Sequence, residues 1–243
     1  MSGCTYDLHI HSCLSPCGDD SMTAYNIAGM AKIKGLRAAA LTDHNTCRNC
    51  RPFFSACAGY GVVPVPGMEL TTAEEIHLLL LFDSLEQAEA FEDKFAPFRC
   101  RIPNRPDIFG NQYLIADDDS VSGEYEFLLP PASSLGLSDA CELALSFGAA
   151  VIPAHIDRPS NGIIGILGQM PESPRFGCVE LKDPKALPEM VRTDLSIGSC
   201  RVITDSDAHY LWDINEADAV LPVDPHGDPD GVRKRIIAYL KGR

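Results

Sequence analysis

Short apolar runs alternate with longer segments of helical periodicity along almost the whole chain. Runs such as Ala38-Ala39-Ala40-Leu41 contain no polar residue, which is typical of parallel strands buried on both faces. The pattern predicts strands at residues 5–11, 37–42, 62–70, 76–82, 149–155, 178–182 and 201–205. It predicts helices at residues 22–34, 47–60, 84–98, 138–147, 185–195 and 230–240. About seven βα units of this kind favour a closed α/β barrel over an open sheet.

One stretch, residues 99–131, departs from this rhythm. It contains Pro103, Pro106 and the acidic run Asp117-Asp118-Asp119 among short aromatic segments. We interpret it as an insertion in a βα loop, either a hairpin that caps the site or a surface loop without a function of its own. The chain is therefore expected to form one barrel domain over residues 1–243 that carries this insertion.

Composition and charge narrow the function classes. The chain has 243 residues, of which 45% are hydrophobic, and this content indicates a folded protein. Its net charge of −14, from 20 basic and 34 acidic residues, disfavours extended nucleic acid and anionic membranes as partners. A phosphorylated substrate stays compatible with that charge if divalent metals supply positive charge. No apolar run is long enough for a membrane span and no signal-peptide pattern opens the chain, so we expect a cytoplasmic location.

Histidines and carboxylates gather at the ends of the predicted strands. His9 and His11 end the first strand two residues apart, so strand alternation turns both rings to one face. Later strands end with His44, Glu69, His155, Asp207 and His209. Because the carboxyl ends of parallel strands meet at one mouth of a barrel, these side chains are expected to converge. They exceed the three ligands of one catalytic zinc, which indicates two or three divalent metals.

Two histidines are not explained by strand ends. His77 lies near the start of a predicted strand, and His226 lies in a loop between Pro225 and Gly227. We interpret His226 as a surface histidine.

The ordered motifs DLHIHS, LTDHNT, PGMEL, IHLLL, PAHIDRP and SDAH resemble those of the polymerase and histidinol phosphatase (PHP) superfamily of metal-dependent phosphoesterases. The resemblance implies a distorted (β/α)7 TIM-like barrel with two or three zinc, manganese or iron ions. It also implies the ligand sets. His9, His11 and Asp207 would bind one metal, Glu69 would bridge to a second held by His77 and His155, and His44 and His209 would share a third.

The third site departs from the family pattern. In the histidinol phosphatase branch a histidine follows a Cys-Pro dipeptide at this point, whereas here the run is Ser15-Pro16-Cys17-Gly18-Asp19-Asp20. Cys17 occupies the slot of that histidine, and thiolate is a good zinc ligand. Asp19 or Asp20 could complete the site instead.

The expected chemistry is phosphate ester hydrolysis. A water that bridges two divalent ions loses its proton near neutral pH and becomes a nucleophile. Asp207 and His209 are the candidates for proton transfer, with metal ligation alone as the alternative. Arg158 is the candidate for holding the phosphate, with a surface salt bridge as the alternative. Arg99, Arg101 and Arg105 are weaker candidates for the same role.

The substrate class stays open at this stage. The expected substrate is a small phosphorylated molecule, such as a nucleotide, a sugar phosphate or a compound like histidinol phosphate. Within the same reaction class, the alternative is a phosphodiesterase that acts on short oligonucleotide ends.

Asp7 and Asp43 stand beside ligating histidines and are expected to orient their rings.

Two cysteine pairs suggest a function of another class. Cys13 and Cys17 follow the first strand, and Cys47 and Cys50 follow the second, so all four are expected at one rim of the barrel. They could bind zinc or an iron–sulfur cluster, or they could be reduced thiols. The first possibility would make the protein a non-catalytic metal or redox-sensing module.

Overall fold

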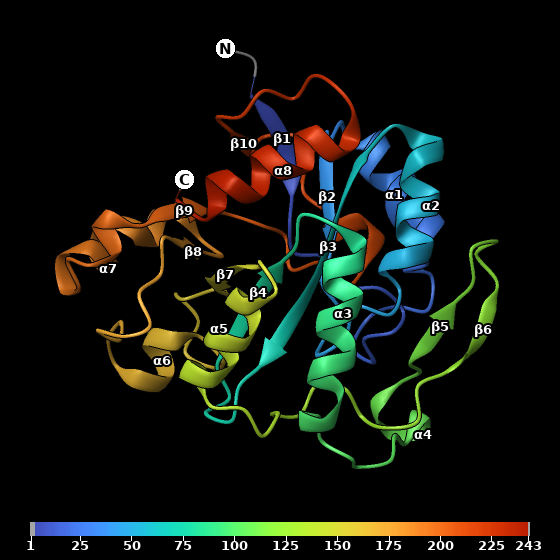
Figure 1. Cartoon of the computed structure of the whole chain (residues 1–243), viewed down its shortest axis with the longest axis horizontal. Helices are drawn as coiled ribbons and strands as arrows, with labels where there is room; N and C mark the ends of the chain where they lie inside the picture. Colours follow the sequence, from blue (N-terminus) through green and yellow to red (C-terminus); the bar gives the residue numbers. More distant parts are fainter. Residues whose placement is uncertain (1–2, 243) are drawn as a thin grey trace.

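A six-stranded sheet with the strand order β10-β1-β2-β3-β4-β7 forms the centre of the computed structural model, which describes residues 3–242 (Figure 1). Its strands are β1 (Cys4–Asp7), β2 (Ala38–Leu41), β3 (Val63–Thr71), β4 (His77–Leu81), β7 (Ala150–Pro153) and β10 (Val220–Leu221). β1, β2 and β3 run parallel, whereas β4 pairs antiparallel with both β3 and β7. The protein therefore has a mixed α/β fold.

A second, parallel pair of strands lies between the two ends of this sheet. It consists of β8 (Cys178–Glu180) and β9 (Arg201–Ile203). On the β7 side, the Ile156 N–H donates to the Glu180 carbonyl at 2.9 Å, and on the β1 side, Ile10 and Ala208 form an isolated parallel bridge. These few bonds bring the loops after β7, β9 and β1 together at one edge.

The predicted α/β class is confirmed, but the expectation of uniformly parallel βα units is wrong for β4. Only residues 72–76 separate β3 from β4, which is too short for a crossover helix, so β4 turns back beside β3. All seven predicted strands and all six predicted helices are present, most with slightly shorter ends. The two-residue strand β10 was not predicted because it is too short to show a pattern.

Helices cover the outside of the sheet. The longer ones are α1 (Ala24–Ile33), α2 (Cys50–Tyr60), α3 (Leu85–Phe95), α5 (Leu137–Ser146) and α8 (Pro229–Leu240). Shorter elements are α4 (Pro106–Phe109), α6 (Ile163–Leu167), α7 (Leu187–Thr193) and the 3-10 turns Ala96–Phe98, Pro184–Ala186, Ile197–Ser199 and Leu211–Asp213. Side-chain caps begin several of them; for example, Ser84 Oγ accepts from the Gln87 N–H at 3.3 Å at the start of α3. None of the helices in residues 3–242 has the length and apolar character needed to cross a membrane.

β2 shows why its sequence lacks polar residues. Ala38 and Ala40 pack in one apolar cluster, which also contains residues of α8, whereas Ala39 and Leu41 pack in the other, together with residues of α1 and α2. Both faces of the strand are therefore buried, as its sequence predicts.

The segment 99–131 contains the antiparallel hairpin of β5 (Tyr113–Ile115) and β6 (Val121–Glu124). The segment packs on the loops that follow β1 and β2. The Tyr113 N–H donates to the Cys13 carbonyl at 2.9 Å, and Asn45 Nδ2 donates to the Leu129 carbonyl at 2.7 Å. The predicted hairpin is therefore present at the rim where the candidate ligands lie.

Candidate metal centre

Glu69 lies at the centre of a ring of histidines. Its side chain is buried, and five histidine nitrogens lie within 3.4 Å of its carboxylate oxygens. Facing Oε1 are His77 Nδ1 at 2.7 Å, His155 Nε2 at 3.1 Å and His9 Nε2 at 3.3 Å. Facing Oε2 are His44 Nδ1 at 2.8 Å and His11 Nε2 at 3.4 Å. One carboxylate is thus shared by side chains from the ends of four strands.

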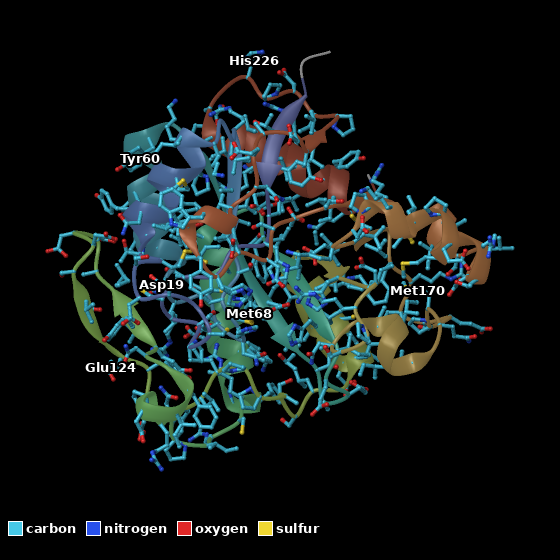
Figure 2. The ribbon with its side chains drawn as sticks, turned by 180° about the vertical axis from the view of Figure 1, so that it is seen from behind. Asp19, Tyr60, Met68, Glu124, Met170 and His226 are labelled. Carbon is cyan, nitrogen blue, oxygen red and sulfur yellow. The ribbon has the colours of Figure 1, made fainter. Side chains whose placement is uncertain are left out.

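The local structure explains how these residues meet. His9 and His11 follow β1, His155 follows β7, and an isolated parallel bridge joins His44, after β2, to Glu69 in β3. Figure 2 shows Met68, the residue before Glu69, in the middle of the molecule. The ligands therefore meet at the edge formed by the carboxyl ends of β1, β2, β3 and β7, where most of them are buried.

Asp207 and His209 come from the loop after β9. Asp207 Oδ1 lies 3.4 Å from His9 Nε2 and 3.3 Å from His11 Nε2, and the His209 ring stacks on His11 with centroids 4.2 Å apart. Asp207 has a φ of 51° and His155 a φ of 30°, both in the left-handed region that such residues rarely adopt. Strained backbone of this kind persists where the surroundings hold it, and it clusters at functional sites.

All nine predicted ligands come together. Within residues 3–242, three groups of side chains have their donor atoms within 4.8 Å of one another: His9, His11, Glu69 and Asp207; His44, Glu69 and His77; and His11, His44 and His209. His155 joins through Glu69, and Cys17 Sγ lies 3.3 Å from His44 Nε2. The assignment of individual residues to individual metals stays a prediction.

Hydrogen bonding within the ring is incomplete in a way that fits bound cations. His44 Nδ1 and Glu69 Oε2 lie 2.8 Å apart but without the geometry of a hydrogen bond, and His155 Nδ1 is also buried without a hydrogen-bond partner. His9 Nε2 and His11 Nε2 face each other at 3.2 Å. Buried polar atoms normally have partners, and their convergence here carries a desolvation cost. Imidazole nitrogens and carboxylate oxygens directed at common points are the donor set of ions such as zinc, manganese and iron, so the residues fit divalent metal ions.

The charges of the ring depend on one another. Burial opposes the charge of Glu69, but His77, His9 and His44 outweigh burial and hold the pKa of the carboxyl well below its usual range. Burial also lowers the pKa of His11, and the neighbouring His44 and His209 lower it further. A neutral imidazole is the form that binds metal, so His11 is ready to act as a ligand.

Cys17 is the exposed member of the first cysteine pair. Desolvation raises the pKa of its thiol, but hydrogen bonds with His209 and His44 outweigh that effect and lower the pKa to about 6. A thiolate beside two imidazoles is consistent with a third metal at this position. Asp19, the alternative, instead accepts hydrogen bonds from Ser21, and Asp20 accepts from Asn111.

Glu180 supports the ring and was missed from the sequence. Its Oε1 lies 2.9 Å from His9 Nδ1, and its Oε2 accepts from the His155 N–H at 2.7 Å. The carboxylate therefore positions two of the candidate ligands at once. The available signal was a lone acidic residue at the end of an apolar strand, Cys-Val-Glu.

The two aspartates expected to orient histidine rings act differently. Asp43 accepts from Ser15 Oγ at 2.8 Å, and Ser15 Oγ lies 3.0 Å from His11 Nδ1, so Asp43 acts on His11 through a hydroxyl. Asp7 accepts from backbone N–H groups instead, those of Ser206 at 3.1 Å, Asn215 at 3.0 Å and His9 at 3.5 Å. Asp7 therefore fixes the loop that carries Asp207.

The structure separates the candidate arginines. Arg158 Nη1 lies 2.8 Å from Asp207 Oδ2, and its side chain is 40% exposed, so it stands at the mouth of the centre. Arg99 is buried and donates to Glu92 and to the Asn45 carbonyl, and Arg105 pairs with Asp107 at 2.7 Å. Arg99 therefore joins the start of the insertion to α3 and to the loop after β2. The prediction that it holds a phosphate is wrong because its side chain is buried.

The two cysteine pairs do not gather into one ligand group in the part of the chain that the structure describes. Cys13, Cys47 and Cys50 are buried in the larger apolar cluster, whereas Cys17 faces His44. None of the candidate ligand groups in the described part of the chain contains a cysteine. The reading of these residues as a zinc or iron–sulfur module therefore has no support in the structure.

Comparisons with known proteins agree with this geometry. Residues 7–92 match the family model described as the PHP domain, and no protein of curated function matches the sequence. The lesion-specific endonuclease PfuEndoQ from Pyrococcus furiosus has a TM-score of 0.63 at 19% identity, over 98% of this chain and 56% of that chain. A complex of Endonuclease Q with a 27-mer duplex carrying an abasic lesion has a TM-score of 0.58 at 20% identity, over 85% of this chain and 49% of that chain.

A third solved structure, a proposed metal-dependent phosphoesterase from Bifidobacterium adolescentis, has a TM-score of 0.52 at 18% identity over 98% of both chains. The present chain spans about half the length of the two endonuclease chains. At these identities the likeness shows a shared fold.

Proposed function

The chain is a PHP-domain protein, and on this premise we propose that it hydrolyses a phosphate ester in a small phosphorylated molecule with the help of two or three divalent metals. The domain and the ligand groups indicate a metal-dependent hydrolase. The observation that carries the proposal is the Glu69 carboxylate with five histidine nitrogens within 3.4 Å. Divalent metals at such a site lower the pKa of water and neutralise phosphoryl oxygens.

The residues of the chain have separable tasks in this proposal. Glu69 and its histidines hold the metals, and Glu180 and the Asp43–Ser15 pair keep the rings of His9 and His11 in place. Because these groups are buried, they are fixed before a substrate arrives, which is the condition for efficient electrostatic stabilisation.

Arg158 and His209 lie on the open side of the centre. The partly exposed guanidinium of Arg158 is placed to bind a phosphoryl oxygen beside Asp207. Of the two candidates for proton transfer, the His209 side chain is 22% exposed and the Asp207 side chain is 6% exposed. We assign the transfer of a proton to the leaving oxygen to His209, because a substrate reaches it more easily.

A second candidate is hydrolysis of a nucleic-acid phosphodiester. The two endonuclease structures support it, since one of them was determined with a DNA duplex bound. The net charge of −14 opposes it, because a long backbone of phosphates would be repelled. We therefore rank it second.

The test is a metal and activity analysis of protein purified without chelators or nickel affinity resin. Elemental analysis is expected to find two or three equivalents of metal, and phosphate release is expected for at least one member of a panel of phosphomonoesters. Chelation should abolish turnover, and manganese or zinc should restore it. A His11→Ala variant should lose metal and activity, whereas His226→Ala, the same change in an exposed loop, should keep both.

The two candidate functions give different results in the same assay. Cleavage of a duplex with an abasic site, without release of phosphate from any monoester, would favour the second candidate. Absence of both bound metal and turnover would overturn the proposal.

A further inference from the structure

A groove of about 290 Å³ opens beside the metal centre, between the loop after β7 and the short helix α7. Arg158 lines this groove, and its Nη1 also lies 2.8 Å from Asp207 Oδ2. The groove therefore begins within one side chain of the candidate ligands. In Figure 1, α6 and α7, whose residues line it, stand on the same side of the molecule.

The floor of the groove is apolar. Ile156 is buried, and Ile164, Ala186 and Met190 are half-buried beside it. A half-buried apolar floor next to a polar reaction centre is typical of ligand sites, in which a few polar groups orient a mostly apolar ligand.

The acidic side chains at the rim are already engaged. Asp157 accepts from the backbone N–H groups of Lys182 and Asp183, both at 2.8 Å, and Glu189 pairs with Arg192 at 2.8 Å. Among the described residues that line the groove, Arg158 is the one basic side chain. A second phosphate or another anionic group on the ligand would therefore find no further cation there.

The loop that forms one wall is tightly folded. A Cβ at Gly162 would lie 2.5 Å from the Arg158 carbonyl oxygen, and one at Gly165 would lie 2.4 Å from the Pro159 carbonyl oxygen. These positions accept only glycine without a backbone shift. Together with the bonds of Asp157, this packing makes the groove a preformed feature.

We propose that this groove, the leaving-group groove, binds the uncharged organic part of the substrate. The inference rests on the proposed function and names its substrate class, which is phosphate monoesters of compact apolar or aromatic alcohols. Hydrolysis breaks the bond between phosphorus and the alcohol oxygen and forms a bond between phosphorus and a water oxygen. One proton of that water ends on the alcohol oxygen, so the products are the free alcohol and inorganic phosphate.

Steady-state kinetics with two substrates tests the groove. The metal-loaded protein is expected to hydrolyse 1-naphthyl phosphate with at least a tenfold higher kcat/KM than glycerol 2-phosphate, about the discrimination that an apolar pocket provides. Ala186→Leu fills the floor and should raise the KM for 1-naphthyl phosphate about tenfold, with little change for glycerol 2-phosphate. Ala58→Leu, the same change on an exposed position of α2, should change neither substrate.

Binding without turnover separates this inference from the proposed function. Calorimetry with 1-naphthylmethylphosphonate, which resists hydrolysis, is expected to show binding that Ala186→Leu and Met190→Gln both weaken. If the kcat/KM values for glycerol 2-phosphate and 1-naphthyl phosphate are equal, or if the variants impair hydrolysis of both substrates equally, the inference about the groove is wrong and the proposed function stands. If no ester is hydrolysed but the phosphonate binds and the variants weaken its binding, the proposed function is wrong and the groove is still a binding site for the organic group. If the phosphonate does not bind, the groove is overturned.

Discussion

His77 Nδ1 lies 2.7 Å from Glu69 Oε1, although His77 begins its strand and Glu69 lies near the end of another. The antiparallel pairing of β3 and β4 explains the contact. Thr71 faces His77 across the pair, and Glu69 is two residues from Thr71, so Glu69 and His77 are diagonal neighbours on one face. The start of β4 thereby lies at the same edge as the carboxyl ends of β1, β2 and β7.

Removing the charge of Glu69 should dismantle the centre. We expect Glu69→Gln to lower metal content to one equivalent or less and to reduce kcat/KM by at least about a hundredfold, because the two metals that Glu69 is proposed to bridge lose a shared carboxylate. Elemental analysis and phosphate release measure the two effects. Glu142→Gln, on the exposed face of α5, is the matched control. Full metal content in Glu69→Gln would contradict the bridging role.

Glu180 should act on metal affinity through His9. Glu180→Ala removes the acceptor at His9 Nδ1 and is expected to weaken metal binding by about 10–100-fold. Glu180→Gln keeps one acceptor oxygen and should recover part of that loss. Competition with a chromophoric chelator measures the affinities. Equal affinities in wild type and Glu180→Ala would show that the contact is only structural.

Cys17 should determine the occupancy of the third site. Its sulfur lies 3.3 Å from His44 Nε2, so Cys17→Ala is expected to remove about one equivalent of metal and leave the others bound. Cys100→Ala, at a half-buried cysteine outside the centre, is the control. If Cys17→Ala keeps the wild-type stoichiometry, another side chain completes the site.

Metal binding should release protons. In the metal-free protein, burial opposes the charge of His44, but Glu69 and Cys17 outweigh it and raise the pKa of His44 to about 10 from 6.5. His44 therefore carries a proton at pH 7 that a metal must displace, and the apparent metal affinity should rise with pH up to about 10. Calorimetric titrations in two buffers of different ionisation enthalpy should give different apparent enthalpies.

His44 also affects the stability of the metal-free protein. That stability should fall with rising pH, whereas the apparent metal affinity should rise. Because its folded pKa is raised, the contribution of His44 is complete below pH 6.5 and is lost as the pH rises toward 10. Denaturant unfolding of chelated protein at a series of pH values should show this decline. For the metal titrations described above, identical apparent enthalpies in the two buffers would contradict the protonated state of His44.

The buried Arg99–Glu92 pair should matter for stability. The two side chains are 5% and 9% exposed, and Arg99 also donates to the Asn45 carbonyl. Arg99→Ala removes the buried partner of Glu92, which then keeps Arg48 at 3.1 Å as its ion pair, and it also removes the donor to the Asn45 carbonyl. The change is expected to lower the free energy of unfolding by about 2 kcal/mol. Arg101→Ala, two residues away and exposed, should change it by less than about 0.5 kcal/mol. Denaturant unfolding measures both variants, and equal values would contradict the structural role of Arg99.

The sequence by itself determined the elements and most of the candidate ligands. Apolar runs such as residues 38–41 must be strands buried on two faces, and histidines or carboxylates placed directly after them have no apolar role there. His9, His11, His44 and Asp207 were identified in this way. These inferences succeed because burial and strand alternation are local properties of the chain.

Tertiary structure decided what depends on contacts between distant segments. The antiparallel return of β4 carries His77 to Glu69, and the β7–β8 contact brings Glu180 to both His9 and His155. The sequence made both Arg99 and Arg158 candidates for holding a phosphate, yet one is buried against Glu92 and the other reaches Asp207. The partner of a charged side chain is set by the packing of elements far apart in the chain, and local pattern carries no information about it.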